Sequence, residues 1–190
     1  PGTELGSQET KSKYKMETKF RVVPRCYGTY NILGEDICVS EIEEICTSHN
    51  TISFDDYLEC RKMNLIINIF YNDGVFEELI FLLKKLNISI WDWIKVIYQN
   101  STNKNFLKFN HLLSDYLHDT EKELWPNYND LRNFCNKKEN IDKFIKGELG
   151  SNLVFKYKSR SLTIDLEHVA KIAEKSTIEI ISSKVGGQHD

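Results

Sequence analysis

The feature that most constrains the fold is a long series of apolar residues at helical spacing that follows Ser53. Between residues 54 and 72 the apolar side chains recur every three or four positions, as on one face of a helix. Ser53 is well placed to cap this helix, and Asp55 and Asp56 complement the helix dipole in the first turn. Gly74 follows, and glycine tolerates the left-handed conformation that ends helices. The sequence therefore predicts a helix over residues 53–72.

The same spacing continues through most of the chain and predicts further helices. Residues 153–157 also alternate as a strand would, so both structures stay open there, although one continuous helix is favoured. Ser89 is expected to cap a helix of its own. The predicted helices cover residues 75–86, 89–98, 106–124, 128–149 with a break near 137–140, and about 151–175.

Before Ser53 the sequence favours short β segments. Residues 20–24 form a β-prone run, and a proline closes it because proline cannot donate to a strand ladder. Residues 27–36 are expected to form a turn, since glycine and asparagine recur there. Residues 37–47 fit either a strand or one face of a helix, and we favour the strand. The predicted fold class is α+β, predominantly α-helical, with residues 1–50 as the β part, 51–182 as a helical domain and 183–190 as a frayed tail.

Charge and cysteine content exclude several classes of function. Lys and Arg number 25 against 28 Asp and Glu, so the net charge of -3 gives no broad positive field for nucleic acid. The apolar runs fall far below the roughly 20 residues of a spanning helix, which predicts a soluble protein. The five cysteines are widely spaced and form no C-x-x-C pair, so reduced thiols in a cytoplasmic protein are expected. The residues also contain no complete catalytic motif.

A metal site is one hypothesis for the helix over residues 106–124. His111, Asp115 and His118 are separated by four and three residues, which places them on one helical face. Imidazole and carboxylate at that spacing can ligate zinc or iron. An exposed polar face is the alternative interpretation of the same residues.

Four residues in the β part are candidates for a site. Arg25 and Cys26 directly follow a proline that closes a β-prone run, and loops at strand ends often carry function. Glu41 and Glu43 would share one face of a strand, where paired carboxylates can perform acid–base chemistry if they are partly buried. A solvated acidic face is the alternative for the two glutamates.

Several stretches, taken together, resemble the C-terminal part of radical SAM proteins that carry an N-terminal cobalamin-binding domain. The likeness is strongest over residues 1–100 and weaker from there to about 180. The stretches that carry it are Pro1–Leu5, Glu17–Gly28, Glu41–Ile45, Thr47–Tyr57 and Phe70–Gly74.

The resemblance implies a doubly wound cobalamin-binding domain and a partial α/β barrel ahead of this chain. In that family three cysteines near the start of the barrel bind a [4Fe–4S] cluster that cleaves S-adenosylmethionine, but the motif is absent here. The chain itself should therefore bind no cofactor and should close the barrel and shape access for an unknown small-molecule substrate. Pro1 would lie in a loop after a late barrel strand, with the missing domains upstream, and Arg25, Cys26, Glu41 and Glu43 would face the substrate.

The second functional hypothesis belongs to a different class. The apolar stripes of the helices could serve a protein partner or a dimer, in which case the chain is a helical interaction module without enzymatic activity.

Overall fold

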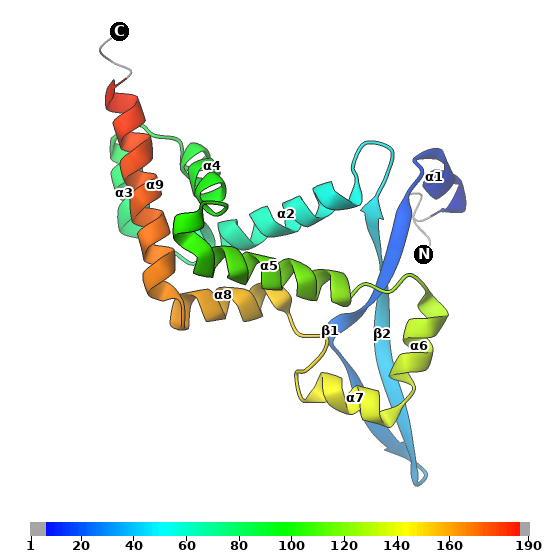
Figure 1. Cartoon of the computed structure of the whole chain (residues 1–190). Helices are drawn as coiled ribbons and strands as arrows, with labels where there is room; N and C mark the ends of the chain where they lie inside the picture. Colours follow the sequence, from blue (N-terminus) through cyan, green and yellow to red (C-terminus); the bar gives the residue numbers. More distant parts are fainter. Residues whose placement is uncertain (1–6, 187–190) are drawn as a thin grey trace. The chain divides into compact units, whose positions relative to one another are not determined.

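The computed structural model describes residues 7–186 (Figure 1). Helices hold 62% of the chain and an antiparallel hairpin lies near the N-terminus, which confirms the predicted fold class. The contacts divide the chain into two compact units. Unit 1 comprises residues 1–59 and 118–153, and unit 2 comprises residues 60–117 and 154–190. The hairpin thus shares its unit with helices of the region predicted as the separate domain 51–182.

Unit 1 is built on the hairpin of β1 (Glu17–Ile32) and β2 (Glu35–Ser48), preceded by α1 (Gln8–Lys13). The two strands are joined by Leu33 and Gly34 alone, whose φ angles are +54° and +89°. Positive φ at both turn residues is the conformation of a type I′ turn, whose twist matches that of the strands. The predicted turn over residues 27–36 is therefore wrong in extent, because cross-strand pairing keeps all but two of these residues extended.

The inner face of the hairpin packs on α6 (Tyr128–Cys135) and α7 (Lys138–Ile145). The ring of Tyr27 lies 5.1 Å from the ring of Phe144, centroid to centroid. A two-stranded hairpin alone is at best marginally stable in water, so the two helices supply the core that holds it. The fully packed members of this core are Val22, Leu131, Cys135, Ile141 and Phe144.

Unit 2 is helical, and its centre is aromatic. The ring of Phe70 lies 5.4 Å from that of Phe76, 6.3 Å from Trp93 and 5.7 Å from Phe109. Such pairs add roughly 0.5–1.5 kcal/mol each beyond simple burial. The elements of this unit are most of α2 (Phe54–Ile67), the π-helical turn η2 (Asn68–Asn72), α3 (Glu77–Lys85), α4 (Ile90–Asn100), η3 (Lys104–Phe106), most of α5 (Leu107–Lys122), α8 (Leu153–Thr163) and α9 (Leu166–Gly186).

Buried polar side chains join α4 to α9. Trp93 Nε1 donates to Thr177 Oγ1 at 3.0 Å, and Asn100 Nδ2 donates to Ser176 Oγ at 3.0 Å. All four side chains are at least nine-tenths buried. Buried polar groups are costly unless paired, so these bonds fix the rotation of α9 against α4.

The helix signals read from the sequence are confirmed at several termini. Ser53 Oγ accepts from the Asp56 amide at 3.1 Å, and Ser89 Oγ accepts from the Asp92 amide at 3.4 Å. The break expected near residues 137–140 falls between α6 and α7, and residues 153–157 are helical.

The single helix predicted over residues 151–175 is wrong, because two helices meet there. The carbonyl of Asp165 accepts from the amides of His168 and Val169, so Asp165 immediately precedes α9. Asp is favoured at the position before a helix, and this local signal competes with the continuous apolar periodicity of residues 153–173. Residues 183–186, predicted to fray, belong to α9. The predicted loop at Pro1–Leu5 and the tail residues 187–190 lie outside the described residues.

Across residues 7–186, every helix is too short or too polar to cross a membrane.

Candidate functional site

The outer face of the hairpin, opposite α6 and α7, carries a row of apolar side chains. Tyr30 pairs with Ile37 in the strand register, and Gly28 pairs with Val39. Paired residues in an antiparallel sheet lie on the same face, and successive residues alternate between faces. Tyr27 and Cys38 pack into the core of unit 1, so their neighbours in sequence face the opposite way. The inner face of the hairpin packs on the helices (Figure 1), whereas the outer face of its distal half carries Tyr30, Ile37 and Val39.

We call the exposed apolar residues of this end of the hairpin the outer patch. Antiparallel sheets with one solvated face normally place polar side chains on it, and the outer patch departs from that rule. Its members, with their exposed fractions, are Tyr30 (62%), Ile32 (52%), Leu33 (101%), Ile37 (42%) and Val39 (41%). With these exposed fractions the five residues present on the order of 500 Å² in total, which lies within the roughly 300–600 Å² range of the largest patch on a typical monomer.

Leu33 at the tip is the least expected member of the outer patch. Its φ of +54° is a conformation that Asn, Asp and Gly adopt far more readily than leucine. Its side chain makes no compensating contact, because it is fully exposed. A strained, solvated leucine lowers the stability of the isolated fold, and strain of this kind often occurs at functional sites.

The sequence contains an alternating apolar pattern that is typical of the outer patch, but the predicted turn covers the same residues. Tyr30 and Ile32 alternate with polar residues on one side of Gly34, and Ile37 and Val39 alternate on the other. The β-prone run predicted over residues 20–24 ends well before β1 does, because Gly28 and Asn31 favour a turn locally.

The candidate residues Arg25, Cys26 and Glu41 meet at a bulge next to the outer patch. Val22 pairs with Ile42 and Tyr27 pairs with Ser40, so residues 23–26 stand opposite Glu41 alone. Arg25, at φ +67°, takes the left-handed conformation that absorbs the extra residues. The Glu41 carboxylate acts on the Cys26 thiol across this bulge.

The chemistry of the bulge does not favour nucleophilic catalysis. Loss of hydration, together with the charge and the hydrogen bond of Glu41, raises the pKa of the Cys26 thiol. A thiol with a raised pKa is rarely ionised at neutral pH, so it is a weak nucleophile. Glu43, the fourth candidate, is held apart from the others by Arg21, whose Nε lies 2.6 Å from the Glu43 carboxylate.

The proposed metal ligands lie on α5. His111, Asp115 and His118 are all exposed, and the Asp115 carboxylate lies 3.0 Å from Nη1 of Arg160. Over the described part of the chain, no three His, Cys, Asp or Glu side chains are grouped as a metal site requires. The metal site stays a prediction.

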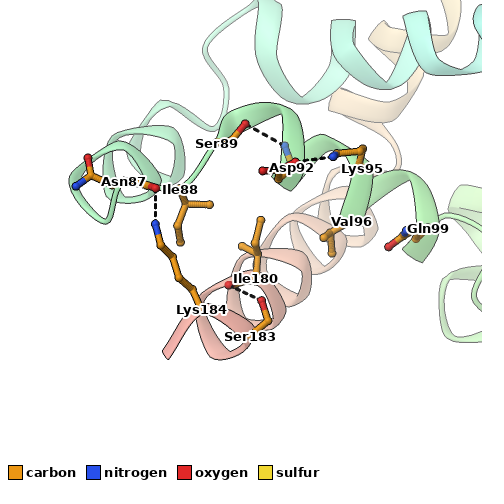
Figure 2. Close-up of a pocket in the computed structure, with 10 residues that line it drawn as sticks. All are labelled: Asn87, Ile88, Ser89, Asp92, Lys95, Val96, Gln99, Ile180, Ser183 and Lys184. Atoms are coloured by element: carbon orange, nitrogen blue, oxygen red, sulfur yellow. Dashed lines mark hydrogen bonds and ion pairs between the residues drawn. The ribbon is translucent and has the colours of Figure 1, made fainter. Parts of the chain in front are cut away.

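Unit 2 has an open groove of about 560 Å³ between the α3–α4 connection, α4 and α9 (Figure 2). Lys184 Nζ donates to the carbonyl of Leu86 at 3.0 Å and also to that of Asn87. Lys95 lies 2.5 Å from Asp92, and Ser89 caps α4. These groups already pair with one another, so we interpret the groove as part of the packing contact between α4 and α9.

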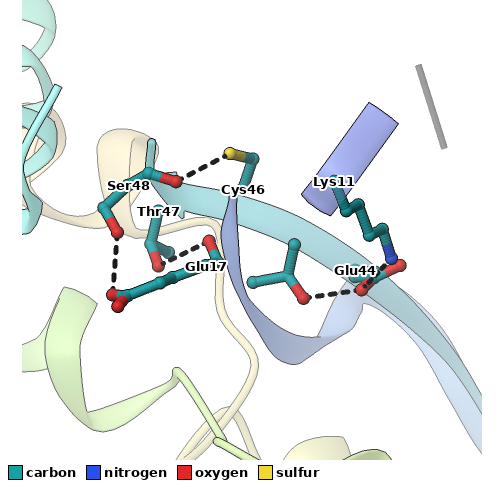
Figure 3. Close-up of polar contacts among 7 residues, drawn as sticks. Lys11, Glu17, Glu44, Cys46, Thr47 and Ser48 are labelled. Carbon is teal, nitrogen blue, oxygen red and sulfur yellow. Dashed lines mark hydrogen bonds and ion pairs between the residues drawn. The ribbon is translucent and has the colours of Figure 1, made fainter. Parts of the chain in front are cut away.

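The base of the hairpin holds a network of polar contacts that joins neighbouring elements of the fold (Figure 3). Glu44 accepts from Lys11 Nζ and Thr18 Oγ1, each at 2.6 Å, which ties α1 to both strands. These two donors lower the pKa of the Glu44 carboxyl. Ser48 Oγ donates to Glu17 at 2.8 Å, and this bond joins β2 to the start of β1.

The structure thus defines a helical protein with a hairpin that exposes an apolar face. Searches of protein-family models, of curated proteins and of solved structures find no match to this chain. The resemblance to radical SAM proteins therefore stays a prediction.

Proposed function

We propose that this chain is a protein-binding module and that the outer patch is its contact surface. The observation that carries the proposal is the solvated apolar face of β1 and β2, opposite a face that is packed on helices. The largest exposed apolar patch on a monomer is often functional, even at this ordinary size. The proposal follows the interaction-module hypothesis, but it assigns binding to the hairpin and not to the helical stripes.

The face of the hairpin is a better contact surface than its β1 edge. Pro24 removes one amide donor from that edge, and the bulge at residues 23–26 interrupts it. Closer to the base, Phe20 and Trp125 exchange two backbone hydrogen bonds of 2.8 and 2.7 Å, which occupies the edge there. Pro24, the bulge and the bonds to Trp125 hinder the addition of a further strand to β1. The outer patch has no comparable feature that would hinder contact with another protein.

The binding energy would come from burial of the patch. At about 25 cal/mol per Å², burying some 500 Å² gives about 12 kcal/mol before the cost of association. That cost is roughly 4–15 kcal/mol, so the patch supports a modest affinity unless polar contacts at its rim add to it.

Matched lysine substitutions test the proposal in the cells from which the protein comes. Ile37→Lys places a charge in the outer patch, and Ile178→Lys places one at an isoleucine of α9 that is 59% exposed. Tagged wild type and both variants are purified with their associated proteins, which are quantified by mass spectrometry. At least one protein enriched by the wild type and by Ile178→Lys should be lost with Ile37→Lys. Equal recovery by all three chains would contradict the proposal.

The family resemblance supplies a second candidate. A barrel domain ahead of Pro1 could cover the hairpin, and the exposed outer patch supports that arrangement as well. The reading frame upstream of Pro1 tests it: a C-x-x-x-C-x-x-C motif there would support a role in a cobalamin-dependent radical SAM enzyme, and a start codon adjoining Pro1 would contradict it.

A further inference from the structure

We infer that the partner of this chain binds as an extended segment that adds a third strand to the free edge of β2. The segment has two apolar side chains at alternate positions, with a basic side chain at the next alternate position on either side. The inference rests on the proposed function, because the added strand covers the side of the outer patch formed by Ile37 and Val39. Addition of a strand to an open sheet edge is a recurring way in which proteins bind peptides.

The backbone groups of every second residue of β2 point away from β1. Phe20 exchanges both of its backbone hydrogen bonds with Trp125, so its groups point away from its cross-strand partner Glu44. Directly opposed residues are either hydrogen-bonded to each other or both turned away, so the groups of Glu44 also point outward. The two-residue turn gives the same alternation, since the pair that flanks such a turn is hydrogen-bonded and Glu35 belongs to it. The outward groups therefore belong to the even-numbered residues of 36–46.

These outward groups form an open edge. Within residues 7–186, no backbone hydrogen bond outside the strand ladder involves residues 35–47. Residues 35–46 are all exposed or half-buried, β2 contains no proline, and the extra residues of the bulge lie in β1. In Figure 1 the tip of the hairpin extends beyond α6 and α7. A long edge strand without interruptions accepts a further strand readily, so β2 offers the accessible edge of the hairpin.

The outer-face side chains of β2 define which segment fits this edge. Alternate positions along the outer face carry, in the order acid, apolar, apolar, acid, the residues Glu35, Ile37, Val39 and Glu41. Side chains opposite them on an added strand lie on the same face, where opposite charges and apolar pairs stabilise the sheet. The order that fits is therefore basic, apolar, apolar, basic, and it is the same for both directions of the added strand.

Glu35 and Glu41 are available to basic groups of the partner. Both side chains are exposed. The other three acidic side chains of β2 already pair within the chain, with Lys11, Arg21 and Lys138. Among the described residues, neither Glu35 nor Glu41 forms an ion pair, so a basic segment supplies the charges that these two carboxylates lack.

The same charges disfavour a second copy of this chain as the occupant. The acidic side chains of β2 number five, and the strand contains no basic one. Two β2 edges that pair with each other, in either direction, bring acidic strands side by side, and like charges across strands weaken a sheet. The acidic residues thus select against self-association and favour a basic-ended segment of a different protein.

Amide hydrogen exchange of the full chain, measured by NMR, tests how the segment binds. In the free chain the amides of Asp36, Cys38 and Ser40 have no acceptor in β1, so they should exchange faster than those of Ile37 and Val39. The probe is the synthetic peptide KTVTVTK with blocked termini, which has lysine, valine, valine and lysine at alternate positions. At saturation the peptide should slow exchange at the three even-numbered residues about threefold or more.

Two control peptides test the order of side chains. VTKTKTV has the same composition and the same alternation, but its lysines stand in the middle and its valines at the ends. ETVTVTE keeps the valines and carries acidic ends. Each should bind about tenfold or more weakly than KTVTVTK, because unlike pairs replace the matched cross-strand pairs.

Charge reversal on β2 provides the matched test on the protein. The double variant Glu35→Lys with Glu41→Lys should bind KTVTVTK about tenfold or more weakly and ETVTVTE more tightly by a similar factor. The gain for ETVTVTE also shows that the altered hairpin still folds. Glu148→Lys with Glu174→Lys makes the same charge change at exposed residues outside the hairpin and should leave both affinities unchanged.

Several results overturn the inference. These are no change in the spectrum with KTVTVTK up to roughly 2 mM, equal binding of KTVTVTK and VTKTKTV, or binding without slower exchange at the even-numbered residues. Even-numbered amides that are already protected in the free chain, more so at higher protein concentration, would show a second copy at the edge and also overturn it. The proposed function is decided separately: loss of partners with Ile37→Lys in cells supports the outer patch even if the β2 edge accepts no strand.

Discussion

Tyr30 and Ile37 are cross-strand partners in the hairpin, and both side chains stay exposed, at 62% and 42%, while the neighbouring Cys38 packs into the core. The hairpin therefore carries apolar side chains on both faces, but only one face packs into a core. The outer face contributes little to the stability of the free chain, and this difference between the faces gives the first prediction.

Substitutions on the two faces should have very different effects on stability. Ile37→Lys should change the free energy of unfolding by less than about 0.5 kcal/mol, because exposed positions tolerate such changes. Leu131→Ala should lower it by about 3 kcal/mol, because Leu131 is only 1% exposed in the core of unit 1. Urea denaturation of both variants measures the difference. A loss as large for Ile37→Lys as for Leu131→Ala would mean that the outer patch is part of the folded core.

Leu33→Asn should make the free protein more stable and the binding weaker. Asparagine adopts the positive φ of this turn position with less strain than leucine, so a gain of about 0.5 kcal/mol is expected. Urea denaturation measures the gain, and the affinity purification described above measures retention of partners. A variant that is no more stable would contradict the strain at Leu33, and a variant that keeps every partner would contradict its binding role.

These first two predictions depend on features that the sequence signals only in part. The helices of unit 2 follow from apolar spacing and from caps at Ser53 and Ser89, because both signals are local. The length of β1 cannot be predicted from local patterns. Gly28 and Asn31 favour turns locally, and only pairing with β2 keeps them extended. The bulge that brings Arg25 and Cys26 opposite Glu41 depends on strand register, which no local pattern fixes. The outer patch could therefore not be predicted from local sequence patterns, although its apolar residues alternate with polar ones along the chain.

Gly150→Ala should destabilise unit 1 more than Gly147→Ala. Both glycines have positive φ, +62° and +76°, so each alanine introduces backbone strain of about 1 kcal/mol. Only at Gly150 would the new Cβ also meet a packed side chain, 2.5 Å from Cδ1 of Phe144. An overpacked core costs a further 1–3 kcal/mol or so. Thermal denaturation compares the two variants, and equal melting temperatures would contradict the packing around Phe144.

Acid should remove the stabilisation that Glu44 provides. Lys11 and Thr18 lower the pKa of this carboxyl below its ordinary value of 4.5, so the folded state binds the proton less readily than the unfolded state. The resulting stability is fully present above pH 4.5 and is lost as the pH falls through the lowered pKa. Wild type should therefore exceed Glu44→Gln in unfolding free energy at pH 7, and the difference should shrink towards pH 3. A difference independent of pH would contradict this role for the carboxylate charge.

The most direct measurement of the central claim is photo-crosslinking from consecutive positions of β2 in cells. Benzoylphenylalanine replaces Ile37, Cys38, Val39 and Ser40 one at a time, and irradiation joins each probe to whatever protein lies against it. Positions 37 and 39 belong to the outer patch, whereas positions 38 and 40 face α6 and α7. The account predicts intermolecular adducts from positions 37 and 39 and few from positions 38 and 40. Adducts from none of the four positions, or equal yields from all of them, would contradict the claim that the outer patch is a protein-binding surface.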